Sequence, residues 1–492
     1  MWGKGAWRKR KQESHFSSPS PTILPPPMLL PLLALTLGAY AASEVFVGVL
    51  TWNTVEDRSF PLGAWETQQA TVSRLLAPHL SPQRPMIDLL VTAEEALTPP
   101  PPNTSIALAL VQDLRNDTLW SAMERDRATG ARATLAWLPT RRAGDSKAIF
   151  STAFLLPRAS GTTVPLNYAK THPFDQSVFT PGTTGPLTIP VTTNADAGVL
   201  ICYDLLFTLP LCAYQDVTLL ALPTWWVNID ARLAATPTQQ ALARSTGKAV
   251  AAAGPGDGYF NSGSGLYHGN GSVASVFFNN DPFSQVSGVL ASTLSDAPET
   301  PQASVFRDAC DAPSTGVETL DSFPHGGNDT VHLYTLWGNE TTTTPVTAKA
   351  CVPRWSSSPP STICCTLEYT IHSTRSASAS PTTYALVAYS GWYGKTKDMF
   401  PHHVCSFAVA TDLTSGTAAD GFGWANSTSV SFSSLSLTVS GVEGGPGMRP
   451  MPVVAHASMV ATNDYEASPE GTSISTSGEV VAASAFFFPY FK

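Results

Sequence analysis

Charged residues are scarce in this sequence: they make up 13% of its 492 residues, about half of the ~25% typical of soluble domains. Lys and Arg number 28 against 37 Asp and Glu, which gives a formal net charge of -9. A nucleic-acid-binding protein would need a basic face, and a disordered chain would combine high charge with few apolar residues. With 43% hydrophobic and 10% aromatic residues the chain fits neither class. We therefore expect folded domains and no nucleic-acid partner.

Long apolar runs are also scarce. The pronounced one is Met28–Leu37, which follows a basic segment containing Lys4 and Arg8 and precedes the small residues of 38–42. Because spanning a bilayer takes ~20 apolar residues, the run indicates a signal peptide over 1–43 rather than a signal anchor. A start at Met28 would leave a more ordinary signal. No other transmembrane segment is expected.

Six Asn-x-Ser/Thr sequons follow the signal, which together with it indicates a secreted or cell-surface glycoprotein. The seven cysteines are an odd number. In an oxidising compartment six of them can pair, so one is a candidate reactive thiol. The sequons are Asn103, Asn116, Asn270, Asn328, Asn339 and Asn426.

Residues 44–295 alternate β-branched runs with helical segments, the pattern of an α/β sandwich. A helix is predicted over Glu66–Leu80, and a second begins with Thr236 as N-cap and Pro237 in its first turn and ends at Gly247. The predicted strands are Val45–Leu50, Ile87–Thr92, Ala133–Trp137, Ile149–Leu155, Gly198–Tyr203, Val217–Pro223, Ala249–Ala253, Val273–Phe278 and Val286–Leu290.

The composition then shifts to Ser, Thr, Gly and Pro. A linker is expected at 296–310, and 311–492 is predicted to be all-β, with alternating segments such as Tyr384–Tyr389 and Ser429–Val439. The apolar C-terminal segment Ala482–Lys492 is interpreted as a final buried strand.

Three positions in the first region could carry chemistry, because each lies where a strand gives way to a loop. Cys202 closes an apolar run, Lys170 stands in a polar segment, and Glu94 follows a predicted strand with Glu95 beside it. An activated nucleophile needs such a place. Each also has a plain reading: a buried or disulfide-bonded cysteine, a surface lysine and a solvated carboxylate. Their individual contexts do not decide between these readings.

Taken in chain order, the three segments resemble the nitrilase (carbon-nitrogen hydrolase) superfamily: a Glu after a strand, Lys170-Thr171-His172-Pro173-Phe174, and Cys202-Tyr203-Asp204. The stretches 222–228 and 263–267 look similar to the vanin and biotinidase branch, as does the order of cysteines and strands after 350. The resemblance implies an α-β-β-α sandwich followed by a smaller β-rich base domain. The motif before Glu94 departs from the family, which usually has Pro there, and Glu95 stays an alternative base.

The resemblance also implies site roles. Cys202 would be the nucleophile, Glu94 the general base and acid, and Lys170 the cation that holds the thiolate and the oxyanion, with no metal or organic cofactor. The backbone N–H of Tyr203 would be a second oxyanion donor, and Asp175 would support the site in place of the family's missing second glutamate. The substrate pocket is expected at Trp225, Trp226 and Asn228.

By the same resemblance, Cys351, Cys364, Cys365 and Cys405 would form two bridges in the β-rich region and Cys212 would pair with Cys310, one of 15 possible connectivities. The function implied is cleavage of a small-molecule amide such as pantetheine or a biotinyl amide. The alternative is a secreted module that keeps this fold without catalysis.

Overall fold

The structure of the chain is a computed structural model in which Ala42–Lys492 form one compact unit. The expected signal peptide at 1–43 and the alternative base Glu95 lie outside the described residues. No helix in the described ranges is long and apolar enough to cross a membrane. These ranges are 44–51, 70–94, 96, 112–113, 130–141, 148–157, 166–228, 231–256, 261–279, 286–311, 328–336, 341–354, 362–372, 381–392, 401–410, 428, 430–442, 448–456, 461–468 and 471–489.

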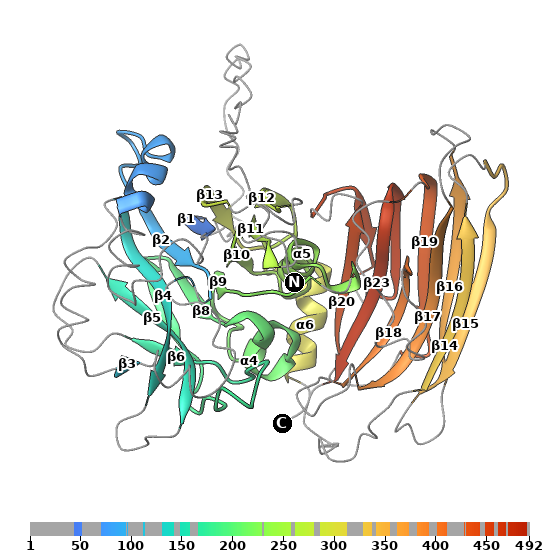
Figure 1. Ribbon diagram of the computed structural model, residues 1–492, viewed down its shortest axis with the longest axis horizontal. Helices are drawn as coiled ribbons and strands as arrows, with labels where there is room; N and C mark the ends of the chain where they lie inside the picture. The colour runs from blue at the N-terminus through green and yellow to red at the C-terminus, as the bar shows by residue number, and fades with distance from the viewer. Residues whose placement is uncertain are drawn as a thin grey trace, which may run out of the picture. The chain divides into compact units, whose positions relative to one another are not determined.

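Two β-sheets pack against each other in the first part of the chain (Figure 1). Their inward side chains share one fully buried core, to which Val49 and Leu89 contribute from one sheet and Leu220 and Ala251 from the other. The first sheet has the order β13 (Gly288–Ser295), β1 (Glu44–Thr51), β2 (Ile87–Thr92), β4 (Ala131–Arg141), β5 (Ile149–Pro157) and β6 (Asn167–Ala169), with β3 (Gln112–Asp113) beside β4. The second has the order β12 (Val273–Phe277), β11 (Ser264–Tyr267), β10 (Ala249–Ala253), β9 (Leu219–Pro223), β8 (Ala195–Val199) and β7 (Thr188–Thr192).

Parallel pairing in both sheets decides where the candidate residues lie. Strands β1, β2 and β4 are parallel, and so are β8, β9 and β10. The carboxyl ends of parallel neighbours lie at one edge of a sheet, so Glu94 follows β2 at that edge of the first sheet and Cys202 follows β8 at that edge of the second. The strand predicted over Gly198–Tyr203 is wrong at its end: β8 stops at Val199, because Cys202 already begins the 3-10 helix η2 (Cys202–Leu206).

Helix α5 (Ala235–Thr246) ends as predicted at Gly247, whose φ of 69° suits a left-handed cap. Its start differs from the prediction, since the N-cap is Ala234 and makes no side-chain cap bond. The Ala235 N–H donates instead to Asn228 Oδ1 at 2.7 Å, and Thr236 Oγ1 accepts a bond from the Ala461 N–H at 3.0 Å. The remaining helical elements are 70–76, η1 (Ala77–His79), α4 (Thr208–Cys212), η3 (Ala231–Leu233) and α6 (Pro301–Asp311).

The described part of 328–489 consists of strands, as predicted, and forms two five-stranded sheets that enclose a second core. In this core Tyr384 stacks on Phe407 with ring centroids 4.7 Å apart, and Phe432 meets both rings edge-on. The sheet orders are β14 (Asn328–Leu336), β17 (Thr382–Trp392), β18 (Pro401–Val409), β23 (Val480–Pro489), β20 (Met448–His456), and β15 (Val346–Pro353), β16 (Thr362–Ile371), β19 (Phe432–Ser440), β22 (Ser473–Gly478), β21 (Tyr465–Ala467). The α/β sandwich with a β-rich second region is therefore confirmed.

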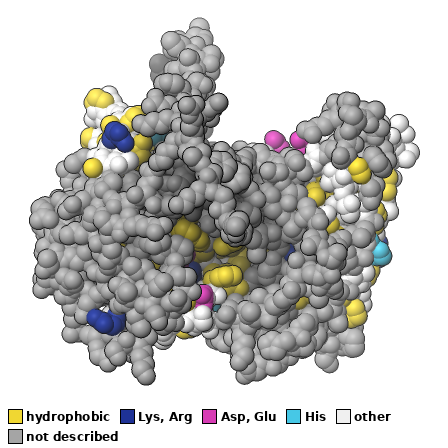
Figure 2. Space-filling view, in the orientation of Figure 1, with side chains coloured by type: hydrophobic (Ala, Val, Ile, Leu, Met, Phe, Trp, Pro, Cys, Tyr) yellow, Lys and Arg dark blue, Asp and Glu magenta, His cyan; other side chains and the backbone are white. Residues whose placement is uncertain are grey.

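Residues 296–310, the expected linker, contain most of α6, whose Ala303 and Phe306 are buried. In Figure 1 this helix and α5 lie beside β20, and both contact that strand. Figure 2 shows few charged side chains among the described residues of this face, and hydrophobic side chains near its centre, in the area of α4.

Three disulfides use six of the seven cysteines. Cys212–Cys310 joins α4 to α6, Cys351–Cys364 joins facing residues of β15 and β16, and Cys365–Cys405 links β16 to β18 in the other sheet. The family resemblance implied the Cys212–Cys310 bridge and two bridges among the other four cysteines, and it left the partners within those four open. Cys202 is the free cysteine, and it is buried.

Two of the expected glycosylation sites fall in described segments. Asn270 is exposed, and its Oδ1 accepts bonds from Ser272 N and Oγ in a local turn. Asn328 begins strand β14. The others, at Asn103, Asn116, Asn339 and Asn426, lie outside the described residues.

Candidate active site

Cys202 sits on a strained turn. Its φ is 46°, and it is the non-glycine residue with positive φ within the described ranges. A side chain in the left-handed region costs on the order of 1–3 kcal/mol, and such strain persists only where the surroundings enforce it. The turn is closed by the Asp204 N–H, which donates to Ile201 O at 3.0 Å, and by the Phe207 N–H, which donates to Asp204 O at 3.1 Å. The backbone therefore holds the thiol in a fixed direction at the end of β8.

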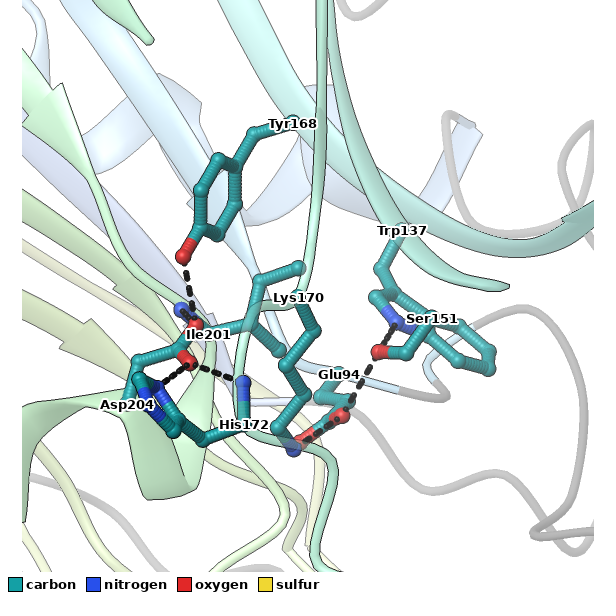
Figure 3. Close-up of polar contacts among 8 residues, drawn as sticks. All are labelled: Glu94, Trp137, Ser151, Tyr168, Lys170, His172, Ile201 and Asp204. Carbon is teal, nitrogen blue, oxygen red and sulfur yellow. Dashed lines mark hydrogen bonds and ion pairs between the residues drawn. The ribbon is translucent and has the colours of Figure 1, made fainter. Parts of the chain in front are cut away.

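Asp204 ties this turn to the segment that carries Lys170 (Figure 3). Its fully buried carboxylate accepts bonds from the Ile201 N–H at 3.1 Å, the Tyr168 hydroxyl at 2.9 Å and the His172 N–H at 2.8 Å. Tyr168 and His172 flank Lys170 in sequence, so one carboxylate fixes the nucleophile turn and the lysine segment together. Asp204, and not Asp175, makes the bonds that join these two segments.

Lys170 and Glu94 form a buried ion pair. Lys170 Nζ donates to Glu94 Oε1 at 2.8 Å, and the two side chains are only 4% and 5% exposed. Ser151 Oγ donates to the same oxygen at 3.0 Å and accepts a bond from Trp137 Nε1 at 2.8 Å. Burying two charges is costly unless each is paired and hydrogen-bonded, and here both conditions hold. Since both bonds reach Oε1, they leave the other carboxylate oxygen of Glu94 for further chemistry.

The charges in this site act on one another. Burial works to lower the pKa of Lys170, but Glu94, Cys202 and Asp204 outweigh it and raise that pKa above its usual range, so the ammonium persists. Burial raises the pKa of the Cys202 thiol to about 12, the Lys170 charge opposes this rise, and Glu94 adds to it. These effects favour the protonated thiol at neutral pH.

Two residues that follow β9 also contact the thiol. The Thr224 side chain and the Trp225 backbone N–H both act to lower the pKa of Cys202. Thr224 is fully buried and was not among the residues predicted from the sequence. One signal was present: Thr224 follows β9 as Cys202 follows β8, and these strands are parallel neighbours.

Of the other expected site residues, Asp175 is exposed, whereas Trp226 and Asn228 are buried. Asp175 is exposed, and its Oδ1 accepts bonds from Ser177 N and Oγ, within its own loop. Trp226 is buried and donates from Nε1 to Leu233 O at 2.6 Å. Asn228 is buried too, and its Nδ2 donates to Ser262 O at 2.7 Å. Trp226 and Asn228 hold the fold around the site, whereas Trp225 reaches the thiol through its backbone.

Aromatic rings surround the nucleophile turn. Tyr203 meets Phe207 and Phe174 edge-on, with centroids 5.3 and 5.5 Å apart, and His172 stacks on Phe207 at 3.7 Å. Phe174 is 60% exposed, the most exposed large apolar side chain of the described residues. An apolar surface of this kind next to a reactive group suits the binding of a small organic molecule.

The β-rich region reaches the same turn. Arg449 of β20 is fully buried, and its Nη2 donates to Leu205 O at 2.8 Å, within η2. Burial lowers the pKa of this guanidinium to about 9. A strand far along the chain thus supports the helix that begins with Cys202.

Comparison with known proteins gives a structural likeness only. No protein-family model matches the sequence, and no curated protein matches it. Among solved structures it is similar to a mutant of the Nesterenkonia AN1 amidase from the nitrilase superfamily, at 19% identity over 52% of this chain and 91% of that chain, with a TM-score of 0.39. A mutant of that amidase in complex with butyramide is 18% identical over 51% and 91% of the two chains, with a TM-score of 0.40. Such values do not decide what this chain does.

Proposed function

We propose that this chain is a secreted amidohydrolase that cleaves a linear carbon-nitrogen amide bond through a cysteine acyl-enzyme. The observation that carries the proposal is the buried Lys170–Glu94 ion pair beside the free Cys202 on its strained turn. A cysteine that only fills space needs neither a buried cation nor a carboxylate. A nucleophile with a raised pKa needs both, one to hold the thiolate and one to take its proton.

In the first half of the reaction, Cys202 Sγ attacks the amide carbonyl carbon while Glu94 takes the thiol proton. The carbonyl electrons move to the oxygen, and the Lys170 ammonium stabilises this oxyanion together with the backbone N–H of Tyr203. Collapse of the tetrahedral intermediate breaks the carbon-nitrogen bond, and Glu94 returns its proton to the leaving amine. A thioester with Cys202 remains.

In the second half, Glu94 removes a proton from water, whose oxygen attacks the thioester carbon. The oxyanion forms again beside Lys170, and its collapse releases a carboxylic acid and returns the proton from Glu94 to the sulfur. The products are one acid and one amine, and the steps use groups of this chain and water alone.

Pantetheine and biotinyl amides such as biocytin are the first substrates to test, because the family resemblance implies them. The rings of Phe174, Tyr203 and Phe207 support an acyl part that is uncharged near the scissile bond. The three disulfides fit an oxidising location outside the cytosol, where such compounds would be salvaged.

The test measures amine release from both substrates by wild type, Cys202→Ala and Lys170→Ala. We expect both variants to fall to background, and an acyl group to appear on Cys202 by mass spectrometry in the wild type. Lys349→Ala serves as the matched control, because Lys349 is exposed on β15. Equal turnover by wild type and Cys202→Ala would exclude Cys202 as nucleophile. Lack of turnover and of any acylation in the wild type would favour a non-catalytic module.

A further inference from the structure

The hydroxyl of Thr224 is buried without a partner next to the reactive sulfur. Thr224 is 0% exposed, and within the described part of the chain its Oγ1 has no hydrogen-bond partner in the resting structure. Its backbone N–H is satisfied by Ala253 O at 2.8 Å. A buried hydroxyl that makes no hydrogen bond costs free energy, so its presence calls for a physical reason.

Strand register brings this hydroxyl to Cys202. In the parallel pair of β8 and β9, Val199 faces Ala221, and the Leu200 N–H donates to Ala221 O at 3.1 Å. Cys202 and Thr224 lie equally far beyond that facing pair, at the carboxyl ends of adjacent strands. The Thr224 side chain also acts to lower the pKa of Cys202, so the sulfur is a group that its hydroxyl can meet when the thiol loses its proton.

We propose that Thr224 Oγ1 is a hydrogen-bond donor reserved for the Cys202 thiolate, and thus a further catalytic residue of the amide hydrolysis proposed above. It donates to Sγ as Glu94 takes the thiol proton, and again when the thioester breaks and the sulfur regains its electron pair. Thr224 keeps its own proton throughout, so Glu94 remains the group that moves protons.

A donor without a partner in the resting state has a kinetic advantage. An interaction that forms only as charge develops lowers the barrier, whereas one that already exists in the resting state does not. The Trp225 backbone N–H acts on the same sulfur, but it cannot be removed by substitution. The side-chain donor can be removed, and this makes the proposal testable.

Two substitutions separate the hydroxyl from the volume of the side chain. Thr224→Val replaces the hydroxyl by a methyl group, and Thr224→Ser keeps it. The readouts are the rate at which iodoacetamide alkylates Cys202 between pH 6 and pH 11, followed by peptide mass spectrometry, and kcat/KM for amine release. Hydrogen bonds to charged groups are stronger than those between neutral groups. We therefore expect Thr224→Val to lower the alkylation rate and kcat/KM about 10- to 100-fold and to move the pH profile of alkylation to higher pH. Thr224→Ser should stay within about threefold of wild type, because it keeps the donor.

Thermal unfolding distinguishes this role from a structural one. Thr224→Val removes an unpartnered buried hydroxyl, so it should unfold at the same temperature as wild type or higher, although it is less reactive. An unchanged alkylation profile in Thr224→Val would overturn the proposal, as would a Ser variant as unreactive as the Val variant, or a wild-type Cys202 that is not alkylated at any pH. Alkylation needs no amide substrate: if no amide is cleaved but the profile still shifts, the donor role stands and the proposed function fails.

Discussion

The ion pair between Lys170 and Glu94 is the feature whose removal should be felt most strongly. At a separation of 2.8 Å, two unit charges attract by about 6 kcal/mol in a medium with an effective dielectric constant of about 20. Replacing Lys170 by Met removes this attraction and leaves a carboxylate in a site where the side chain is 5% exposed. Breaking a buried pair in this way typically costs about 3–5 kcal/mol. We expect a loss of that size in the free energy of unfolding of Lys170→Met.

The double variant separates the pair from its members. In Lys170→Met with Glu94→Gln neither charge is left buried, so most of the loss should return and the double variant should be more stable than Lys170→Met alone. Urea unfolding of wild type, Lys170→Met, Glu94→Gln and the double variant gives the coupling energy between the two side chains. Lys349→Met is the exposed control, and its free energy of unfolding is expected within ±0.5 kcal/mol of wild type.

The urea unfolding experiments should be done near neutral pH. Burial alone would lower the pKa of Lys170, but the neighbouring negative charges raise it in the folded state. The contribution of Lys170 to stability is therefore fully present below the unfolded pKa of ~10.4 and is lost as the pH rises above that value. A double variant whose loss equals the sum of the two single losses would refute the reasoning, because it would show that the two charges do not interact.

Two further predictions concern the β-rich region. Arg449→Met removes the bond to Leu205 O, so kcat should fall by about tenfold or more while KM stays near its wild-type value in steady-state kinetics; an unchanged kcat would contradict a link to the Cys202 turn. Burial, with a smaller effect of Arg354, lowers the pKa of His403 to about 3 in the folded protein. In the unfolded chain the pKa of this histidine is ~6.5, so below that pH the unfolded chain binds a proton that the folded protein does not. The free energy of unfolding of the wild type should therefore fall by about 2 kcal/mol from pH 7 to pH 5. Measured by urea unfolding, the fall should be smaller for His403→Gln, and an equal fall in both proteins would refute this role of His403.

Local pattern was enough to predict much of the fold. The strands β1, β2, β5, β9 and β10 lie within a few residues of the predicted runs, because their apolar and β-branched residues are buried between two sheets. Gly247 ends α5 as predicted, since a residue without Cβ adopts a positive φ at little cost. The pattern failed at the end of β8, where Leu200 and Ile201 continue the apolar run but the chain already turns.

The missed features depend on contacts between distant residues. Thr236 looked like an N-cap, yet its hydroxyl bonds the Ala461 N–H, and Asn228 satisfies the first turn of α5 instead. Asp175 was favoured as the supporting carboxylate from its place in the chain, but Asp204 accepts two bonds from the segment that carries Lys170 and one within its own turn. Of these bonds, those from Ile201 to Asp204 and from Ala235 to Asn228 join residues close in sequence, and the others join residues more than 30 positions apart.

The high pKa of Cys202 also affects how long the protein can survive in an oxidising medium. Oxidants and disulfides react with the thiolate, and burial, by raising the pKa of Cys202, makes the thiolate scarce at pH 7. The other six cysteines form three disulfides, which is consistent with an oxidising environment. Burial therefore slows oxidation of the one remaining sulfur, and in the proposed reaction Glu94 and Lys170 generate the thiolate when a substrate is bound.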